Sequence, residues 1–298
     1  MKRATRILAA LLCVLLLLPT LALAESAPSL KKQIAQSAEG MSALGGKKGE
    51  LLKGRELFPA GDSVCDWLAI AMALSGTRES YSDYLAELKA HVEDAYAKNG
   101  CLDCNKATEY HRIALTVLAL GGDPTNFGTK PDGSAIDLIA EGTYNYARDP
   151  GAQGLNGWIW ALLTLDAGDT EVPADALYSR EDMVNAISVA KEPDGGFGLI
   201  PGKSDVDITA MAVQALAPYR DQMETEIDAA LSYLSGQLTD TCGYIAYGDE
   251  NAESTAQVIL ALCALGIDPE TDSRFVKGEH TLLTELSQFR EADGTYRH

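Results

Sequence analysis

The chain has 298 residues, of which 46% are hydrophobic and only 7% aromatic, and its 43 acidic and 24 basic residues give a formal net charge of −19. Proteins bind nucleic acid through lysine and arginine side chains that neutralise phosphates, and anionic membranes attract the same side chains. So acidic a chain is therefore expected to bind neither.

The N-terminus has the pattern of a secretory signal peptide. Lys2, Arg3 and Arg6 precede an apolar run over residues 7–18, and small residues follow at 22–24. This order predicts export and cleavage before Glu25, giving a secreted protein that is extracellular or periplasmic. The run is shorter than the roughly 20 residues of a membrane span, so no span is expected after cleavage. The mature chain would carry 21 basic and 43 acidic residues, a formal net charge of −22.

Five cysteines would remain in the mature protein: Cys65, Cys101, Cys104, Cys242 and Cys263. Because the number is odd, at least one free thiol is expected, and Cys263, within an apolar run, is predicted to be a buried core residue. Cys101 and Cys104 form a lone C-x-x-C without a second pair or nearby histidines, so no metal site is predicted. A disulfide is expected instead, either between these two or to Cys65.

Apolar, alanine-rich runs that favour helix return along the chain, and each is followed by a glycine or proline. They begin at Asp66, Tyr110, Asn156, Asp205 and Glu253. Leucines at equivalent places in these runs, at 74, 120, 165, 216 and 265, are 46, 45, 51 and 49 residues apart. A regular period of this size indicates an array of supersecondary units, so these runs predict five inner helices.

Amphipathic segments alternate with the inner runs and predict outer helices. They cover residues 29–44, 81–98, 134–147, 179–190, 221–237 and 277–289. Two layers of helices follow, giving an all-α fold with about six outer and five inner helices. A sixth inner helix would fall beyond residue 298, so we expect a ring that is open at this seam or a chain that is truncated at its C-terminus. The expected organisation is a signal peptide at 1–24, an N-terminal helix and linker at 25–60, and a repeat domain at 61–298.

Glycine turns and a helix-start pattern carry a family resemblance. The turns are DGGFG at 194–198, CGY at 242–244 and DGTY at 293–296, and the helix-start pattern is D-x-D-x-T-A at 205–210. Together they resemble the repeats of terpenoid cyclases and protein prenyltransferases, whose fold is an α/α toroid. The resemblance implies a toroid here, in which glycine supplies the positive φ of each turn.

The activities within this superfamily transfer only in part. Class II terpenoid cyclases use a D-x-D-D-T-A acid motif, and here Asp205 and Asp207 stand at its first and middle acids while Ile208 replaces the third. Asp207 would be the proton donor of such an enzyme, supported by Asp205. Prenyltransferases hold zinc with an Asp, a Cys and a His. Here Thr209 stands where the Cys belongs, and the sequence reads Glu253, Ser254, Thr255 where the His would be wanted. That activity is therefore not expected, and no cofactor is predicted.

Polar and aromatic residues gather at the starts of the inner helices, where equivalent ends of a toroid would converge on one mouth. The predicted ligand-binding residues are Asp66, Trp67, Tyr110, His111, Arg112, Trp158, Trp160, Glu253 and Gln257. Helix capping is the alternative role for three polar residues at these helix starts, Asp62, Asp205 and Ser254, because such residues are favoured at helix N-termini. Capping does not account for the tryptophans, Tyr110, His111 or Arg112.

Three functional hypotheses remain. The first is a secreted module that binds a small molecule, a glycan or a protein partner at the cell surface, as the exported corrinoid-carrier toroids bind a ligand without transforming it. The second is an enzyme, either cyclase-like with Asp207 as proton donor or glycan-active with Asp66, Asp207 and Glu253 as an acid–base set. The third is a purely structural adaptor, to be preferred if no cavity exists.

Overall fold

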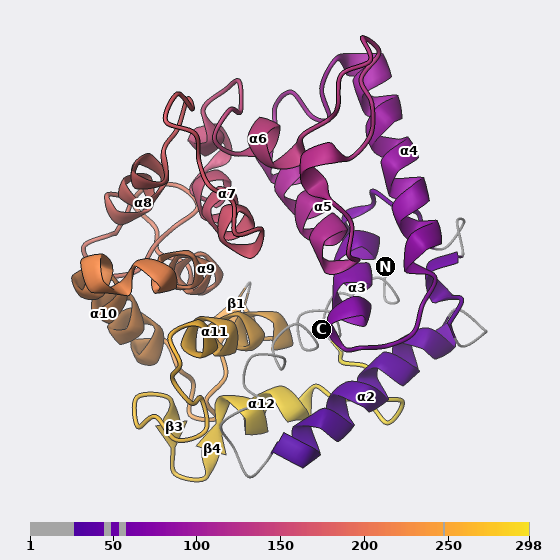
Figure 1. Ribbon diagram of the computed structural model, residues 1–298. Coiled ribbons are helices and arrows are strands. Elements are labelled where there is room, and N and C mark those ends of the chain that lie inside the picture. The colour runs from indigo at the N-terminus through magenta and orange to yellow at the C-terminus, as the bar shows by residue number, and fades with distance from the viewer. Residues whose placement is uncertain (1–26, 45–48, 54–57, 247, 298) are drawn as a thin grey trace. The chain divides into compact units, whose positions relative to one another are not determined.

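The computed structural model describes residues 27–44, 49–53, 58–246 and 248–297, so the predicted signal peptide and Cys13 lie outside the described residues. The described chain is mostly helical, as predicted (Figure 1). It forms two compact units, one of residues 42–186 and the other of the residues up to 41 together with those from 187 on; the two boundaries fall inside the helices at 27–44 and 180–188. Each unit is described by itself.

Every helix expected from the sequence has a counterpart among the described residues. The predicted inner helices are α3 (Ser63–Leu74), α5 (Ala107–Ala119), α7 (Asn156–Ala167), α9 (Val206–Leu216) and α11 (Ala252–Ala264). The predicted outer helices are α2 (Ala27–Leu44), α4 (Tyr81–Asn99), α6 (Leu138–Gly142), α8 (Arg180–Ser188), α10 (Arg220–Gly236) and α12 (Leu282–Gln288). Short 3-10 helices lie at Leu51–Lys53, Pro124–Asn126, Pro150–Gln153 and Ala217–Tyr219.

Two outer helices are shorter than predicted. A loop closed by a bridge between Thr129 and Ala135 takes the first part of the segment expected to form α6. Before α12, the strands β3 (Val276–Lys277) and β4 (His280–Thr281) pair antiparallel, and Thr281 then caps the helix through a capping box. A second small hairpin joins β1 (Ile245–Ala246) to β2 (Asp249–Glu250). Turn chemistry at glycines therefore replaces helix at these places.

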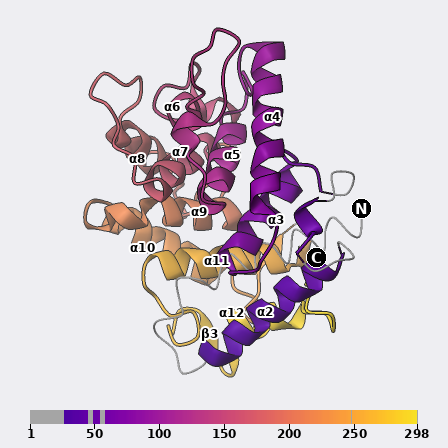
Figure 2. The same ribbon diagram turned by 45° about the vertical axis from the view of Figure 1, so that its right-hand side comes forward.

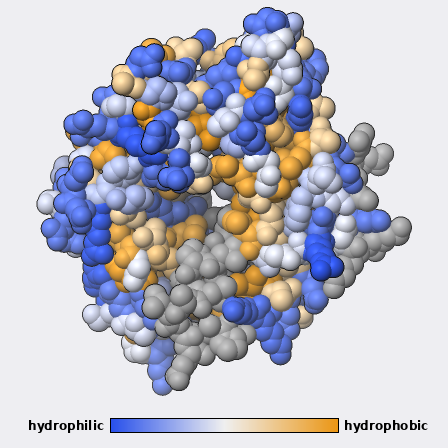
Figure 3. Space-filling model, viewed as in Figure 1, coloured by the Kyte–Doolittle hydropathy of each residue, from blue (hydrophilic) through white to orange (hydrophobic). Residues whose placement is uncertain are grey.

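In the unit of residues 42–186, α5 packs against both α3 and α7, and α6 covers another side of α5 (Figure 1). The contacting side chains are small or apolar, among them Ala114 and Ile113 of α5 and Ala161 of α7, all fully buried. Small side chains let neighbouring helix backbones approach closely. Figure 3 shows hydrophobic residues gathered where α3 and α5 lie.

In the other unit, α9 packs side by side with α11, and α10 covers α9 while α12 covers α11 (Figure 1 and Figure 2). Asp205 caps α9 by accepting from Ile208 N at 3.0 Å, and Asn251 caps α11 by accepting from Ser254 N at 2.9 Å. Both caps are of the preferred residue types and supply hydrogen bonds that the first helical turn lacks.

Four turns share one hydrogen-bond pattern. In each, the first residue donates its N–H to the carbonyl four residues on and accepts from the N–H three residues on; the first residues are Lys130, Glu192, Thr239 and Glu291. The donor three residues on has a positive φ, and these residues are Gly133, Gly195, Cys242 and Gly294. Three of the turns are those quoted in the family resemblance. The fourth, at residues 130–135, was not recognised because its turn ends in alanine instead of an aromatic residue.

The turn at 291–296 packs on α2. A Cβ added at Gly294 would lie 2.7 Å from the carbonyl oxygen of Gln36, and one at Gly40 would lie 2.2 Å from that of Asp293. Arg290 Nη2 also donates to Gln36 Oε1 at 2.8 Å. The Gly195 turn meets α10 in the same way, 2.7 Å from the carbonyl oxygen of Ala229. α2 therefore contacts the last turn as an outer helix contacts an earlier one.

Candidate functional site

The carboxylate of Asp66 organises the start of α3. It accepts hydrogen bonds from Arg112 Nε at 2.9 Å, Tyr84 Oη at 2.7 Å and Gly61 N at 3.0 Å, and it is fully buried. Arg112 in turn donates to the carbonyl oxygen of Gly61 at 2.9 Å and pairs with Glu109 at 2.8 Å. Both predicted binding residues, Asp66 and Arg112, thus tie α3, α4 and α5 together within the core.

Tyr110 and His111 also point into the protein. Tyr110 Oη accepts from Leu102 N at 3.0 Å, and His111 Nε2 lies 2.6 Å from the carbonyl oxygen of Gly142. Burial lowers the pKa of His111 to about 4, so the ring is neutral at pH 7 and Nε2 is the donor to the carbonyl oxygen. Like Asp66 and Arg112, Tyr110 and His111 therefore make their contacts within the core.

Trp67 of α3 and Trp160 of α7 are the sequence-predicted residues that meet at a partly exposed face. Their ring centroids lie 5.2 Å apart with the planes at 52°, although α5 lies between the two helices. Both side chains are half-buried. Tilted and edge-on contacts suit aromatic quadrupoles, so the rings fix one another while part of each stays open to a ligand.

Trp158 points elsewhere on α7. It packs edge-on against Tyr178 with centroids 5.2 Å apart, and a Cβ added at Gly151 would lie 2.4 Å from its Nε1. Trp158 therefore holds the loops before and after α7, apart from the Trp67–Trp160 pair.

An acidic group lies at the neighbouring starts of α9 and α11. Burial raises the pKa of Asp207 to about 6, and the carboxylates of Asp205 and Glu253 act in the same direction. Asp207 Oδ1 is buried without a hydrogen bond of good geometry among the described residues, and the nearby Ser254 hydroxyl offsets the rise only in part. An acid with this pKa can hold or release a proton near neutral pH.

The polar face continues along both helices. Gln214 Nε2 donates to Gln257 Oε1 at 3.1 Å, and both side chains are half-buried. Asp207 and Gln214 lie seven residues apart on α9, and Glu253 and Gln257 lie four apart on α11, so each pair shares a helix face. Gln214 was not predicted as a site residue from the sequence. Its spacing of seven residues from Asp207, which places both on one face of α9, was the signal that could have identified it.

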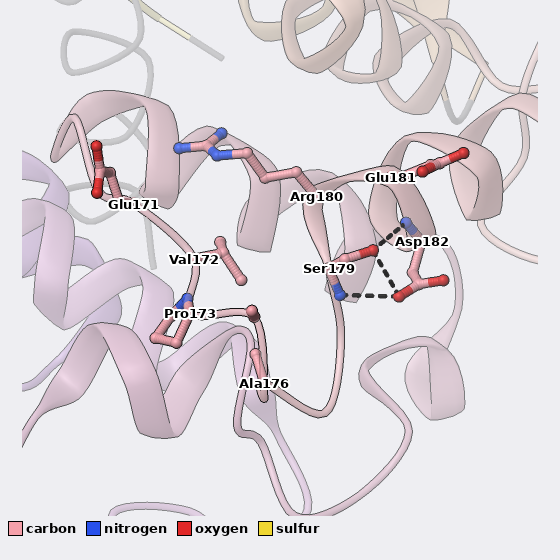
Figure 4. Close-up of a pocket in the computed structure, with 9 residues that line it drawn as sticks. Glu171, Val172, Pro173, Ala176, Ser179, Arg180, Glu181 and Asp182 are labelled. Carbon is pink, nitrogen blue, oxygen red and sulfur yellow. Dashed lines mark hydrogen bonds between the residues drawn. The ribbon is translucent and has the colours of Figure 1, made fainter.

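A pocket of about 670 Å³ lies in the segment between α7 and α8 (Figure 4). Its polar groups serve the loop itself: Asp182 accepts from the N–H and hydroxyl of Ser179 at 2.8 and 2.7 Å, and Arg180 binds Asp166 and the carbonyl oxygen of Thr170. None of the predicted site residues lines this pocket.

Cys101 and Cys104 form a disulfide, the local one of the two pairings that the sequence left open. Cys65, Cys242 and Cys263 are free thiols, which confirms the expectation of at least one. Burial raises the pKa of Cys65 and of Cys263 to about 12 each. Cys263, the last residue but one of α11, is half-buried and not a fully buried core residue.

Within the described ranges, no group of three or more histidine, cysteine or acidic side chains is placed to hold a metal ion. No described helix is both long and apolar enough to cross a bilayer.

The chain was compared with known proteins. No family model matches it, and no curated protein matches it significantly. The site is therefore interpreted from its own geometry.

Proposed function

We propose that the protein is an exported ligand-binding module of the α/α-toroid type. Its ligand is a small molecule, a glycan or a protein partner at the cell surface, and the partly exposed faces at the starts of the inner helices bind it. The observation that carries this proposal is the partly exposed Trp67–Trp160 pair. A helix core that closes with alanine and leucine elsewhere does not need two indoles at its surface, whereas ligand sites favour aromatic walls.

The predicted residues have two different roles, buried support and partly exposed contact, and this arrangement supports a binding function. Asp66, Arg112, Tyr110 and His111 have their hydrogen bonds within the core, so they stabilise the helices that carry the tryptophans. A rigid support of this kind lowers the entropy cost of binding a ligand.

The α9–α11 face is a second candidate surface, polar and within its own unit. Asp207, Gln214, Glu253 and Gln257 are partly exposed there and offer carboxylate and amide groups for orienting a ligand. Placed polar groups of this kind orient the ligand in small-molecule sites.

Export and the toroid rest on the sequence. The N-terminal pattern predicts cleavage before Glu25, and the turns and D-x-D-x-T-A start resemble the terpenoid cyclase and protein prenyltransferase superfamily. N-terminal sequencing of protein recovered from outside the host cytoplasm tests the first point; an intact Met1 contradicts it.

The binding function is tested by native mass spectrometry of protein purified from its own host. A retained mass that is lost in a Trp67→Ala/Trp160→Ala variant supports the proposal. A wild-type protein that carries and captures nothing from host extract, with the fold intact by circular dichroism, contradicts it.

An acid-catalysed reaction at Asp207 is the second candidate, favoured by the raised pKa of that carboxyl. In a cyclase-like reaction Asp207 would protonate an alkene or epoxide, with Asp205 beside it. Asp207→Asn would then abolish turnover while the retained ligand of the mass-spectrometry experiment still binds; turnover that survives the substitution contradicts this role.

A further inference from the structure

We infer that the Trp67–Trp160 pair binds an organic cation, a ligand that presents an ammonium group to the indole faces. The inference rests on the proposed binding function and names the class of ligand that the Trp67–Trp160 pair would bind. It starts from the two rings, which meet at 5.2 Å across α5 and are both half-buried.

The indole groups retain unused capacity. Neither Trp67 nor Trp160 makes a hydrogen bond through Nε1 among the described residues, and neither Nε1 is among the buried polar atoms that lack a partner. The tilt of 52° leaves the rings splayed, so that part of each face is open to a compact group.

The charge around the pair is negative. Asp62, exposed, caps α3 five residues before Trp67, and Asp66 adjoins Trp67 in sequence. Arg112 is the cation here, and it is buried and bound to both Asp66 and Glu109. Arg112 thus meets two carboxylates, of which the Glu109 carboxylate is half-buried, and the exposed charge, on Asp62, is acidic.

These features favour one ligand class. An ammonium over an indole face is attracted by the ring quadrupole, and Trp is the strongest of the aromatic partners. The negative surroundings and the acidic chain as a whole attract cations and repel anions. A neutral sugar would gain binding free energy by packing against the rings, but the carboxylates would add nothing to it.

The test uses choline as the probe and its neutral isostere 3,3-dimethylbutan-1-ol as the matched control. The chain has three tryptophans, so a Trp158→Phe protein emits from the pair alone. We expect choline to change this emission saturably and the neutral alcohol to bind at least about tenfold more weakly. Removing one ring of the pair, by Trp67→Ala or Trp160→Ala, should weaken choline binding about threefold to thirtyfold.

A charge variant separates recognition from folding. Asp62→Asn keeps a good helix cap but removes one carboxylate, so choline binding should weaken about twofold without a change in the urea midpoint. As a second readout, caesium ions should quench the pair more strongly than iodide does.

Equal binding of choline and the alcohol, or no saturable response to choline, overturns the inference. If cellotriose binds the pair and choline does not, the ligand class is wrong but the proposed binding function stands. If choline fails and the host-purified protein also carries and captures nothing, both fail.

Discussion

Arg112 Nε donates to Asp66 Oδ2 at 2.9 Å, and the two side chains form an ion pair of which Asp66 is fully buried and Arg112 nearly so. The pair joins α3 to α5 below the partly exposed tryptophans. A buried pair costs much desolvation when it forms, but removing one partner leaves the other charge buried without compensation.

Arg112→Met should therefore lower the free energy of unfolding by about 3–5 kcal/mol, measured as a shift of the urea midpoint. Asp94→Asn is the control, because Asp94 and Lys98 form an exposed pair on α4 that contributes at most about 0.5 kcal/mol. In a double-mutant cycle, Asp66→Asn should cost much less in the Arg112→Met background than in the wild type. Additive losses would show that the two residues act independently.

The left-handed turns predict an order of alanine substitutions. Gly195→Ala should be the most destabilising, because its φ is +88° and the new Cβ would lie 2.7 Å from the carbonyl oxygen of Ala229. Gly202→Ala has a φ of +89° in open space and should cost only the conformational penalty of about 1–2 kcal/mol. Gly236→Ala, at the end of α10 and without a positive φ, should be neutral or slightly stabilising. Equal losses of stability in Gly195→Ala and Gly202→Ala would exclude the close approach of Gly195 to α10.

The raised pKa of Asp207 predicts pH-dependent stability. A folded pKa of about 6, above the unfolded value of 3.8, means that the folded protein holds the proton more tightly. The stabilisation is fully present below pH 3.8 and is lost as pH rises through 6. Asp207→Asn should therefore match the wild type near pH 4 and exceed it by about 1–3 kcal/mol at pH 7.5 in urea unfolding.

Asp132→Asn is the control of opposite sign for this measurement. Hydrogen bonds from the Ser134 hydroxyl and N–H lower the pKa of Asp132, so its contribution is present at neutral pH and lost in acid. A pH-independent difference between wild type and Asp207→Asn would contradict the raised pKa.

The thiol assignment predicts a labelling pattern. Unfolded protein treated with iodoacetamide without reductant should be modified at Cys65, Cys242 and Cys263 and protected at Cys101 and Cys104, as read by peptide mass spectrometry. In the folded protein at pH 8, Cys65 and Cys263 should react slowly, because thiols with a pKa of about 12 contain little thiolate. Labelling at Cys101 without reductant would contradict the disulfide.

Local physical chemistry determined much of this protein from sequence alone. Alanine-rich runs with glycine stops located α3, α5, α7, α9 and α11, because period and stop signals act within one turn of the chain. Glycine turns were recognised where an aromatic residue followed, and missed at residues 130–135, where alanine stands in its place.

The tertiary structure decided which polar residues belong to the core. His111 and Trp67 are each the fifth residue of their helix, yet His111 turns inward to Gly142 while Trp67 meets Trp160 at a partly exposed face. Likewise Asp66 is fully buried and pairs with Arg112, whereas the described residues give Asp207 no ion pair, and the carboxylates of Asp205 and Glu253 add to the effect of burial in raising its pKa. His111 and Trp67 share their spacing from the helix start, and Asp66 and Asp207 share their residue type. What separates them is the partner that a neighbouring helix brings within hydrogen-bond distance, which only packing over long sequence separations can determine.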